Sequence, residues 1–179
     1  METKTFTITV FSENRVGLLN QITIVFTKRG LNIETLSVSQ SAIKGIHKFT
    51  ITVQTTEDEI EKVVKQIDKR IDVLKSYYNT DEELVHQEIA LYKISTEKIL
   101  EYGSIEAILR KYNIKILEIT NDCVVFSKTG HYEETQGLFE ELSKDIGVLQ
   151  FIRSGRVSIT RSSTERLSDM LAEIDKQRK

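Results

Sequence analysis

The chain has no proline and no tryptophan, and Cys123 is the single cysteine among its 179 residues. Average usage would supply about nine prolines, so the sequence argues against proline-rich linkers and polyproline motifs. One cysteine excludes an intrachain disulfide and a cysteine-rich metal site. A chain without disulfides fits a reducing compartment, and we expect a cytoplasmic protein.

Excess charge of either sign and long apolar runs are also missing. The chain has 25 Lys+Arg and 27 Asp+Glu, a formal net charge of -2 at pH 7. Because it has no overall basic field, binding to nucleic acid through phosphate contacts is disfavoured. There is no apolar run of about 18 residues and no secretory signal pattern, so no membrane association is expected. Small molecules and other proteins are the expected partners of a soluble chain.

The first eighty residues alternate between strand and helix patterns. Residues 5–11 alternate between polar and apolar side chains, which predicts a half-buried strand. Apolar residues at helical spacing predict helices over 17–29 and from 57 to about 71, the second beginning at a capping box of Thr56 and Glu59. Further strands are predicted over 32–40, 49–53 and 73–78. This βαββαβ order predicts a four-stranded sheet with two helices on one face.

The helix-free face of this sheet carries Thr5, Thr7 and Thr9, and we expect it and the sheet edges to be open. A unit of about eighty residues buries only a modest core. Association of two chains that extends the sheet or packs the helices would bury more surface. The sequence therefore predicts a homodimer.

A polar, acidic break over residues 79–83 marks the expected domain boundary, and the pattern then restarts. Strands are predicted over 88–94, 114–119, 124–126 and 148–152, helices over 99–109 and 138–146, and a strand-like extension over 156–161. The tail after Ser162 has a capping box with Glu165 and an amphipathic pattern. We expect domains over 1–79 and 84–161 and a helical tail over 162–179, in the α+β class.

A catalytic or metal-binding set is not evident. The three histidines, His47, His86 and His131, are far apart and form no metal-binding motif, so each is expected on the surface or in a loop. Cys123 is expected as a small buried thiol. The acidic residues at 57–59 suit a helix start, and the arginines at 153, 156, 161 and 166 suit a solvated strand face.

The segment between the first strand and the first helix does suggest ligand binding. It brings Asn14 and Gly17 to a helix N-terminus, where free N–H groups favour an anion and glycine allows close approach. A free amino acid could place its carboxylate there and its ammonium on the side-chain carbonyl of Asn14 or Asn32. The alternative is an ordinary capped turn, with Asn14 as a turn former.

The same residues carry a resemblance to a known family. The pattern is Glu13-Asn14-x-x-Gly17-x-Leu19, followed by Phe26-x-x-Arg29-Gly30-x-Asn32-Ile33-Glu34-x-Leu36-x-Val38. It closely resembles the regulatory small subunit of acetolactate synthase, whose N-terminal half is an ACT domain. The later Asp72-Val73-Leu74 and Arg153-Ser154-Gly155-x-Val157 also resemble segments of that family, so the match extends to about residue 161.

The resemblance implies two tandem ferredoxin-like domains and a noncatalytic subunit. Such a subunit would bind and activate the large catalytic subunit, a transferase that converts two pyruvate molecules to acetolactate and CO2. It would also mediate feedback inhibition by a branched-chain amino acid, with valine the first candidate. Thiamine diphosphate, magnesium and FAD would belong to the large subunit.

By this resemblance Asn14, Gly17 and Asn32 match effector-contact positions, which in ACT dimers lie between protomers. Leu18 and Ile33 are assigned to the apolar side of the pocket. Val16 departs from the small or polar residue usual before this glycine and would narrow the pocket. The second domain would help to hold and activate the large subunit.

Two other functions remain open at this point. One is a tandem ACT-domain amino-acid sensor with a different protein partner, which a pull-down against the large subunit would separate from the first reading. The other is a small ferredoxin-like enzyme, for which no catalytic set is present. RNA binding is disfavoured because the strands present Thr and Ser where a stacking pair of aromatics would be needed.

Overall fold

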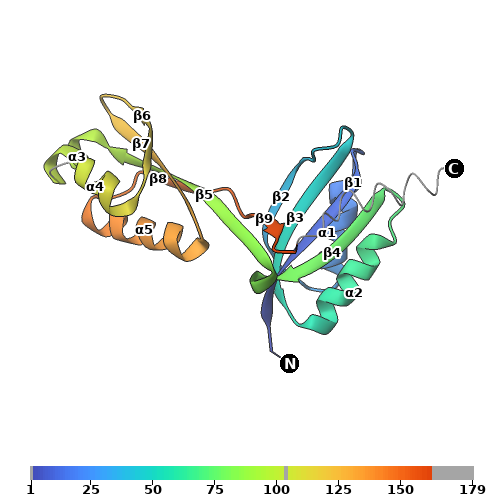
Figure 1. Cartoon of the computed structure of the whole chain (residues 1–179). Helices are drawn as coiled ribbons and strands as arrows, with labels where there is room; N and C mark the ends of the chain where they lie inside the picture. The colour runs from blue at the N-terminus through green and yellow to red at the C-terminus, as the bar shows by residue number, and fades with distance from the viewer. Residues whose placement is uncertain (1, 103–104, 163–179) are drawn as a thin grey trace. The chain divides into compact units, whose positions relative to one another are not determined.

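The computed structural model describes residues 2–102 and 105–162 of the chain. Figure 1 shows two sheets, each with helices on one face. Compact packing divides the described chain into one unit of residues 2–85 with 158–162, and a second unit of residues 86–157. Apart from Ser162, the predicted tail helix lies outside the described residues. No helix among the described residues is long and apolar enough to span a membrane.

The first unit contains the predicted βαββαβ order. Its elements are β1 (Lys4–Glu13), α1 (Leu18–Lys28), β2 (Ile33–Gln40), β3 (Ile46–Thr55), α2 (Glu57–Asp68) and β4 (Val73–Thr80). The strands pair antiparallel in the order β2-β3-β1-β4, so β2 and β4 are the edges. Alternating residues of β1, β3 and one stripe of each helix form the core: Phe6, Ile8, Val10, Leu18, Ile22, Val25, Phe26, Phe49, Ile51, Val53, Ile60, Val63, Ile67 and Val73.

The second repeat follows without a linker. A short 3-10 helix η1 (Asp81–Glu83) leads directly into β5 (Leu84–Ser95). The polar break expected over residues 79–83 therefore consists of the last two residues of β4 and of η1. The remaining elements are α3 (Thr96–Tyr102), α4 (Ile105–Tyr112), β6 (Lys115–Ile119), β7 (Cys123–Gly130), α5 (Tyr132–Asp145), β8 (Gln150–Arg153) and β9 (Val157–Thr160). The second sheet has the order β6-β7-β5-β8, and β9 also pairs with β5. The α+β class and the tandem repeat are confirmed.

Three local predictions are corrected. Thr56 begins α2 without a side-chain cap, because Glu59 instead accepts hydrogen bonds from Lys62 and Arg29. The Lys62 and Arg29 contacts also hold the pKa of Glu59 below its usual value. Helix α2 ends at Asp68, and Ile71 is fully exposed beyond it. The helical region expected over 99–109 begins earlier, at Thr96 of α3, and ends later, at Tyr112 of α4, and residues 103–104 between these two helices lie outside the described residues.

The helix-free face of the first sheet is polar but not open, contrary to expectation. Thr7 and Thr9 are only 1% and 4% exposed, and Thr50 and Thr52 on β3 are buried beside them. The Nζ of Lys48 on this face donates a hydrogen bond of 2.9 Å to the carbonyl of Ser158, which is itself buried. Residues 158–161, expected in the second domain, therefore help to cover this face of the first unit.

Candidate functional site

The connection between β1 and α1 places Gly17 at the start of the helix. Gly17 has φ 87°, in the left-handed region that glycine adopts without strain, and it caps α1 without a side-chain hydrogen bond. A Cβ added to Gly17 would meet no atom within 4 Å, so the space over the helix start is open. Asn14, Arg15, Val16 and Gly17 are all exposed. A ligand can therefore reach the backbone at this point.

Backbone donors at the start of α1 remain available. The N–H of Leu18 donates to the carbonyl of Arg15 at 3.3 Å, and that of Gln21 to the carbonyl of Gly17 at 3.1 Å. Within the described residues no acceptor faces the N–H groups of Leu19 and Asn20. Unsatisfied N–H groups and the positive end of the helix dipole together favour a bound anion.

The first turn of α1 also lacks acidic residues, which would compete for these donors. The first turn of α2, in contrast, carries Glu57, Asp58 and Glu59, and that of α5 carries Glu133 and Glu134. Carboxylates at a helix N-terminus interact with the dipole much as a bound anion would. Among these three helix starts, α1 is the one that leaves this role to a ligand.

The loop that precedes Gly17 is held in place by its neighbours. The Nε of Arg15 lies 3.1 Å from Glu13 Oε2 and 3.2 Å from Asp72 Oδ1, so two carboxylates compensate its charge. The N–H of Asn14 donates to the carbonyl of Gly45 at 3.0 Å. The side chain of Asn14 has no hydrogen-bond partner in the described part of the chain. The backbone is therefore ordered while this amide remains free for a ligand.

The structure does not bring all the predicted site residues together. Ile33 pairs with Val53 at one end of the sheet, whereas Glu13, next to Asn14, pairs with Ile46 at the other. The β3 partners of these two residues, Ile46 and Val53, are seven residues apart. At 3.3 Å per residue, the two ends of the sheet are therefore separated by about 23 Å. Within one chain, Asn14 and Gly17 therefore form one half of a site, and Asn32 and Ile33 form another.

The remaining predicted residues differ in accessibility. Leu18 is only 2% exposed and belongs to the core, so its side chain presents little surface to a ligand. Ile33 is half-buried against the same core. Asn32 is exposed, and its Nδ2 donates to Glu34 Oε1 at 3.3 Å.

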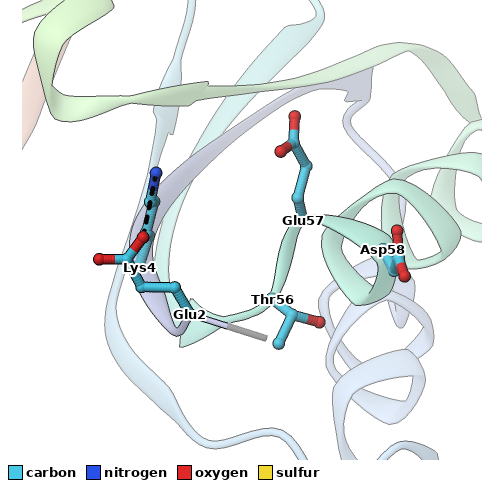
Figure 2. Close-up of a pocket in the computed structure, with 5 residues that line it drawn as sticks. All are labelled: Glu2, Lys4, Thr56, Glu57 and Asp58. Carbon is cyan, nitrogen blue, oxygen red and sulfur yellow. Dashed lines mark ion pairs between the residues drawn. The ribbon is translucent and has the colours of Figure 1, made fainter.

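A pocket of about 350 Å³ lies elsewhere in the first unit, at the start of α2. Figure 2 shows its lining residues, which are Glu2, Lys4, Thr56, Glu57 and Asp58. The lysine forms an ion pair of 3.7 Å with Glu2. The three carboxylates would repel an anion, and no predicted site residue lines this pocket. It is therefore unsuited to the carboxylate of an amino acid.

Two features of the second unit were missed by sequence reasoning. His86 and His131, expected as unrelated surface histidines, stack edge to face with ring centroids 4.7 Å apart. At the start of α5 the N–H of His131 donates a hydrogen bond of 2.7 Å to Oε2 of Glu134, and the N–H of Glu134 donates to the backbone carbonyl of His131. The sequence signal for this helix start is the spacing of His131 and Glu134, a polar residue three positions before a glutamate, as in a capping box. The described residues hold no group of three or more His, Cys, Asp or Glu that could bind a metal ion.

Arg153, expected on a solvated strand face, lies in a partly buried cluster instead. Its Nη1 is 3.4 Å from Oε1 of Glu88, which is 6% exposed. The guanidinium lies over the Tyr132 ring, 4.1 Å from its centroid. The hydroxyl of Thr135 donates to Glu88, and the hydroxyl of Tyr92 donates to the carbonyl of Thr135. Burial is the main cause that raises the pKa of Tyr92. The cluster satisfies its polar groups internally.

Comparison with known proteins identifies relatives for both halves of the chain. Residues 8–75 match the family described as the AHAS small subunit-like ACT domain, and residues 87–162 match the family described as the small subunit of acetolactate synthase. The acetolactate synthase small subunit of Bacillus subtilis is 32% identical over 162 residues, covering 90% of this chain and 93% of the relative. That of Aquifex aeolicus is 33% identical over 154 residues, covering 86% of this chain and 80% of the relative.

A solved structure shares the fold. The crystal structure of the acetolactate synthase small subunit from Thermotoga maritima superimposes with a TM-score of 0.76 at 22% sequence identity. The match covers 90% of this chain and 99% of the other.

Proposed function

Because the chain belongs to the acetolactate synthase small-subunit family, whose ACT domains mark it as regulatory, we propose that it activates the catalytic large subunit and carries its feedback inhibition. The effector would be a branched-chain amino acid, and valine is the first candidate. Membership of a small-subunit family implies association with a large subunit. The chain would then regulate valine, leucine and isoleucine biosynthesis.

The observation that supports effector binding is the open N-terminus of α1. The free N–H groups of Leu19 and Asn20 can receive the effector carboxylate, and no acidic side chain of the first turn competes. The free side-chain carbonyl of Asn14 can accept the ammonium group. Val16 is fully exposed beside Gly17 and can contact an aliphatic side chain. A zwitterion with an apolar side chain fits these three features.

Completion of the site requires a second protomer. β2 is an edge strand, and β1 and β2 both run antiparallel to β3, so they are parallel to each other. If the β2 edges of two protomers meet about a two-fold axis, the two strands run antiparallel. The start of one β2, with Asn32 and Ile33, then lies at the end of the sheet where the partner's α1 begins. This geometry would join the two half-sites into one.

Exposed apolar residues along this edge support such a dimer. Val38 on β2 and Leu19 and Ile24 on α1 are each more than a third exposed. An unpaired strand edge with apolar neighbours favours association that extends the sheet. An effector that bridges two protomers would favour one dimer geometry. It could change the activity of the large subunit only through a difference in affinity for two states of the complex.

The cofactors of the reaction are proposed to reside on the large subunit. Thiamine diphosphate with magnesium needs oxygen ligands for the metal ion, and FAD needs a binding surface for its phosphates. The described residues contain no cluster that could hold a metal ion, and the sequence has no glycine-rich phosphate-binding motif. This chain's contribution would be binding of the effector and of the large subunit.

The test is substitution of Gly17 by a charged residue and by its neutral counterpart. Gly17→Asp places a carboxylate over the free N–H groups, so we expect inhibition by valine to be lost while activation of the large subunit is retained. Gly17→Asn has nearly the same size, tolerates positive φ and carries no charge, so it should respond to valine far better than the aspartate variant. Acetolactate formation by the reconstituted complex, titrated with valine, measures both.

Two results would contradict this proposal. Unchanged inhibition of Gly17→Asp would show that the effector binds elsewhere. Failure of the wild-type chain to co-purify with the large subunit would instead favour an amino-acid sensor with a different partner. Calorimetry with valine, leucine and isoleucine then identifies the effector.

A further inference from the structure

A short segment near the end of the described chain helps to cover the helix-free face of the first sheet. Residues 158–161, the strap, belong to the first unit although they follow the second unit in the sequence. At one end of the strap, the carbonyl of Ser158 accepts a hydrogen bond of 2.9 Å from the Nζ of Lys48. At the other end, the Nε of Arg161 donates to the carbonyl of Leu84 at 3.0 Å. Polar contacts therefore hold both ends of the strap.

The face that the strap helps to cover is itself polar. Its buried side chains include the threonines Thr7, Thr9, Thr50 and Thr52. Ser158 is 3% exposed, and its Oγ has no hydrogen-bond partner among the described residues. Small hydroxyl side chains bury little apolar area, and a hydroxyl without a partner gains hydrogen bonds to water when it is released. The contact between strap and sheet is therefore weak compared with the apolar core on the opposite face.

The apolar side chains near the strap do not contribute to this contact. Val157, directly before the strap, and Ile159 within it are 69% and 66% exposed. They lie outside, whereas the hydroxyl of Ser158 lies inside. Closure of the strap therefore removes little apolar surface from water.

The closed strap also keeps an ammonium group partly out of water. Lys48 on β3 and Lys75 on β4 are both partners of Phe11, from its two sides. Lys75 is exposed, whereas Lys48 is half-buried, and this burial lowers the pKa of Lys48. The direction of the shift means that the hydrogen bond to Ser158 does not offset the lost hydration of the ammonium group. Opening of the strap would return this group to water.

We propose that the strap is a releasable cover, which opens while the rest of the first unit stays folded and thereby uncovers Lys48 and the threonine face. Segments with few apolar contacts open at a lower free energy than the core of the same domain. The chain enters the second unit within β5 and leaves it directly before Ser158. Among the described residues, the closed strap therefore ties the chain to the first unit on both sides of the second unit, and release leaves the tie through β5.

Acetylation and hydrogen exchange of the full-length chain test this proposal. Sulfosuccinimidyl acetate modifies accessible amines, and mass spectrometry of peptides measures each lysine separately. A lowered pKa by itself speeds the reaction of an amine, so slow modification of Lys48 reports its cover. We expect Lys48 to react about tenfold more slowly than Lys75. The N–H of Arg161, which donates to the carbonyl of Glu83, should nevertheless exchange about a hundredfold faster than the N–H of Ile8 in β1.

A variant that weakens one end of the strap connects the two measurements. Arg161→Met removes the side-chain hydrogen bond to Leu84, so acetylation of Lys48 should rise about fivefold while exchange at Ile8 stays unchanged. Arg110→Met replaces an exposed arginine on α4 and should change neither rate.

Three results would overturn the proposal. Equal acetylation rates of Lys48 and Lys75 in the wild type would show that the strap does not cover Lys48. Equal protection of Arg161 and Ile8 would show that the strap opens only when the whole unit unfolds. Faster acetylation in Arg161→Met that occurs only together with faster exchange at Ile8 would have the same meaning. Neither effector nor large subunit is needed, so failure leaves the proposed regulation untouched.

Discussion

The two repeats share one strand order and one layer arrangement, yet their helix-free faces have opposite character. The first face is built from threonines and is buried, and the second has isoleucine and leucine at its centre and is exposed. On these two faces, therefore, the polar side chains are the buried ones. A small polar side chain can be covered where its hydroxyl finds a partner, as Thr35 and Thr52 do at 2.9 Å. On the corresponding face of the second unit, Leu91 and Ile152 lie opposite each other and remain exposed.

The starts of the first helix in each repeat also differ. α1 begins at a left-handed glycine without an acidic residue in its first turn, whereas α3 carries Glu97 there. A built-in carboxylate stabilises a helix start and removes the attraction for an anionic ligand. The start of α1 is therefore available for the anion that we propose, whereas the start of α3 carries its own carboxylate. Three substitutions test how the two units differ in what they bury, in decreasing order of expected effect.

The largest effect is expected from Arg153→Met in the second unit. It leaves the buried carboxylate of Glu88 without its ion pair, which costs about 3–5 kcal/mol in free energy of unfolding. Urea unfolding followed by circular dichroism measures this loss.

Glu88→Gln combined with Arg153→Met is the control for that prediction. It removes the charge together with its partner and should recover most of the lost stability. An Arg153→Met chain as stable as the wild type would show that the pair is not coupled. The buried cluster would then not distinguish the second unit from the first.

A medium effect is expected from Thr9→Ile in the first unit. Thr9 is covered, so the extra methylene meets packed atoms, and overpacking costs about 1–3 kcal/mol. Thr9→Val keeps the size and should cost less. Hydrogen exchange at β1 reports the local opening free energy. Normal protection of Thr9→Ile would mean that the face is open in solution and that the contrast between the two sheets is smaller than described.

The smallest effect is expected from Leu91→Thr in the second unit. The side chain is partly exposed in the single chain, so its replacement should change the unfolding free energy by less than about 0.5 kcal/mol in dilute solution. A large loss would show that Leu91 belongs to the core of its own unit.

Much of the fold follows from local pattern. The strict alternation of β1 and the helical spacing of Ile22, Val25 and Phe26 predicted their elements and their core positions, and the structure confirms both. Helix starts were predicted less well. Thr56 and Glu59 have the spacing of a capping box, but Glu59 accepts from Arg29, which is thirty residues away along the chain. A motif of four consecutive residues cannot predict a contact with an arginine that is so distant in the sequence.

The candidate site was predicted in its parts but not in its assembly. Gly17 and Asn14 could be selected from the sequence, because glycine and asparagine before an apolar helical stripe have a local meaning. The separation of Asn32 and Ile33 from them could not, because it depends on the register of β2 and β3. The pairing of His86 with His131 likewise depends on two segments that meet only after folding.

By itself the sequence determined the order of elements, the twofold repeat and the position of a free helix start, since each depends on spacing over a few residues. The family of regulatory subunits was also readable from its motifs. Only the tertiary structure decided which polar residues are buried, which arginine pairs with a buried glutamate, and which apolar residues remain outside. These properties depend on what covers a surface, and the covering segment is far away in the chain or belongs to another molecule.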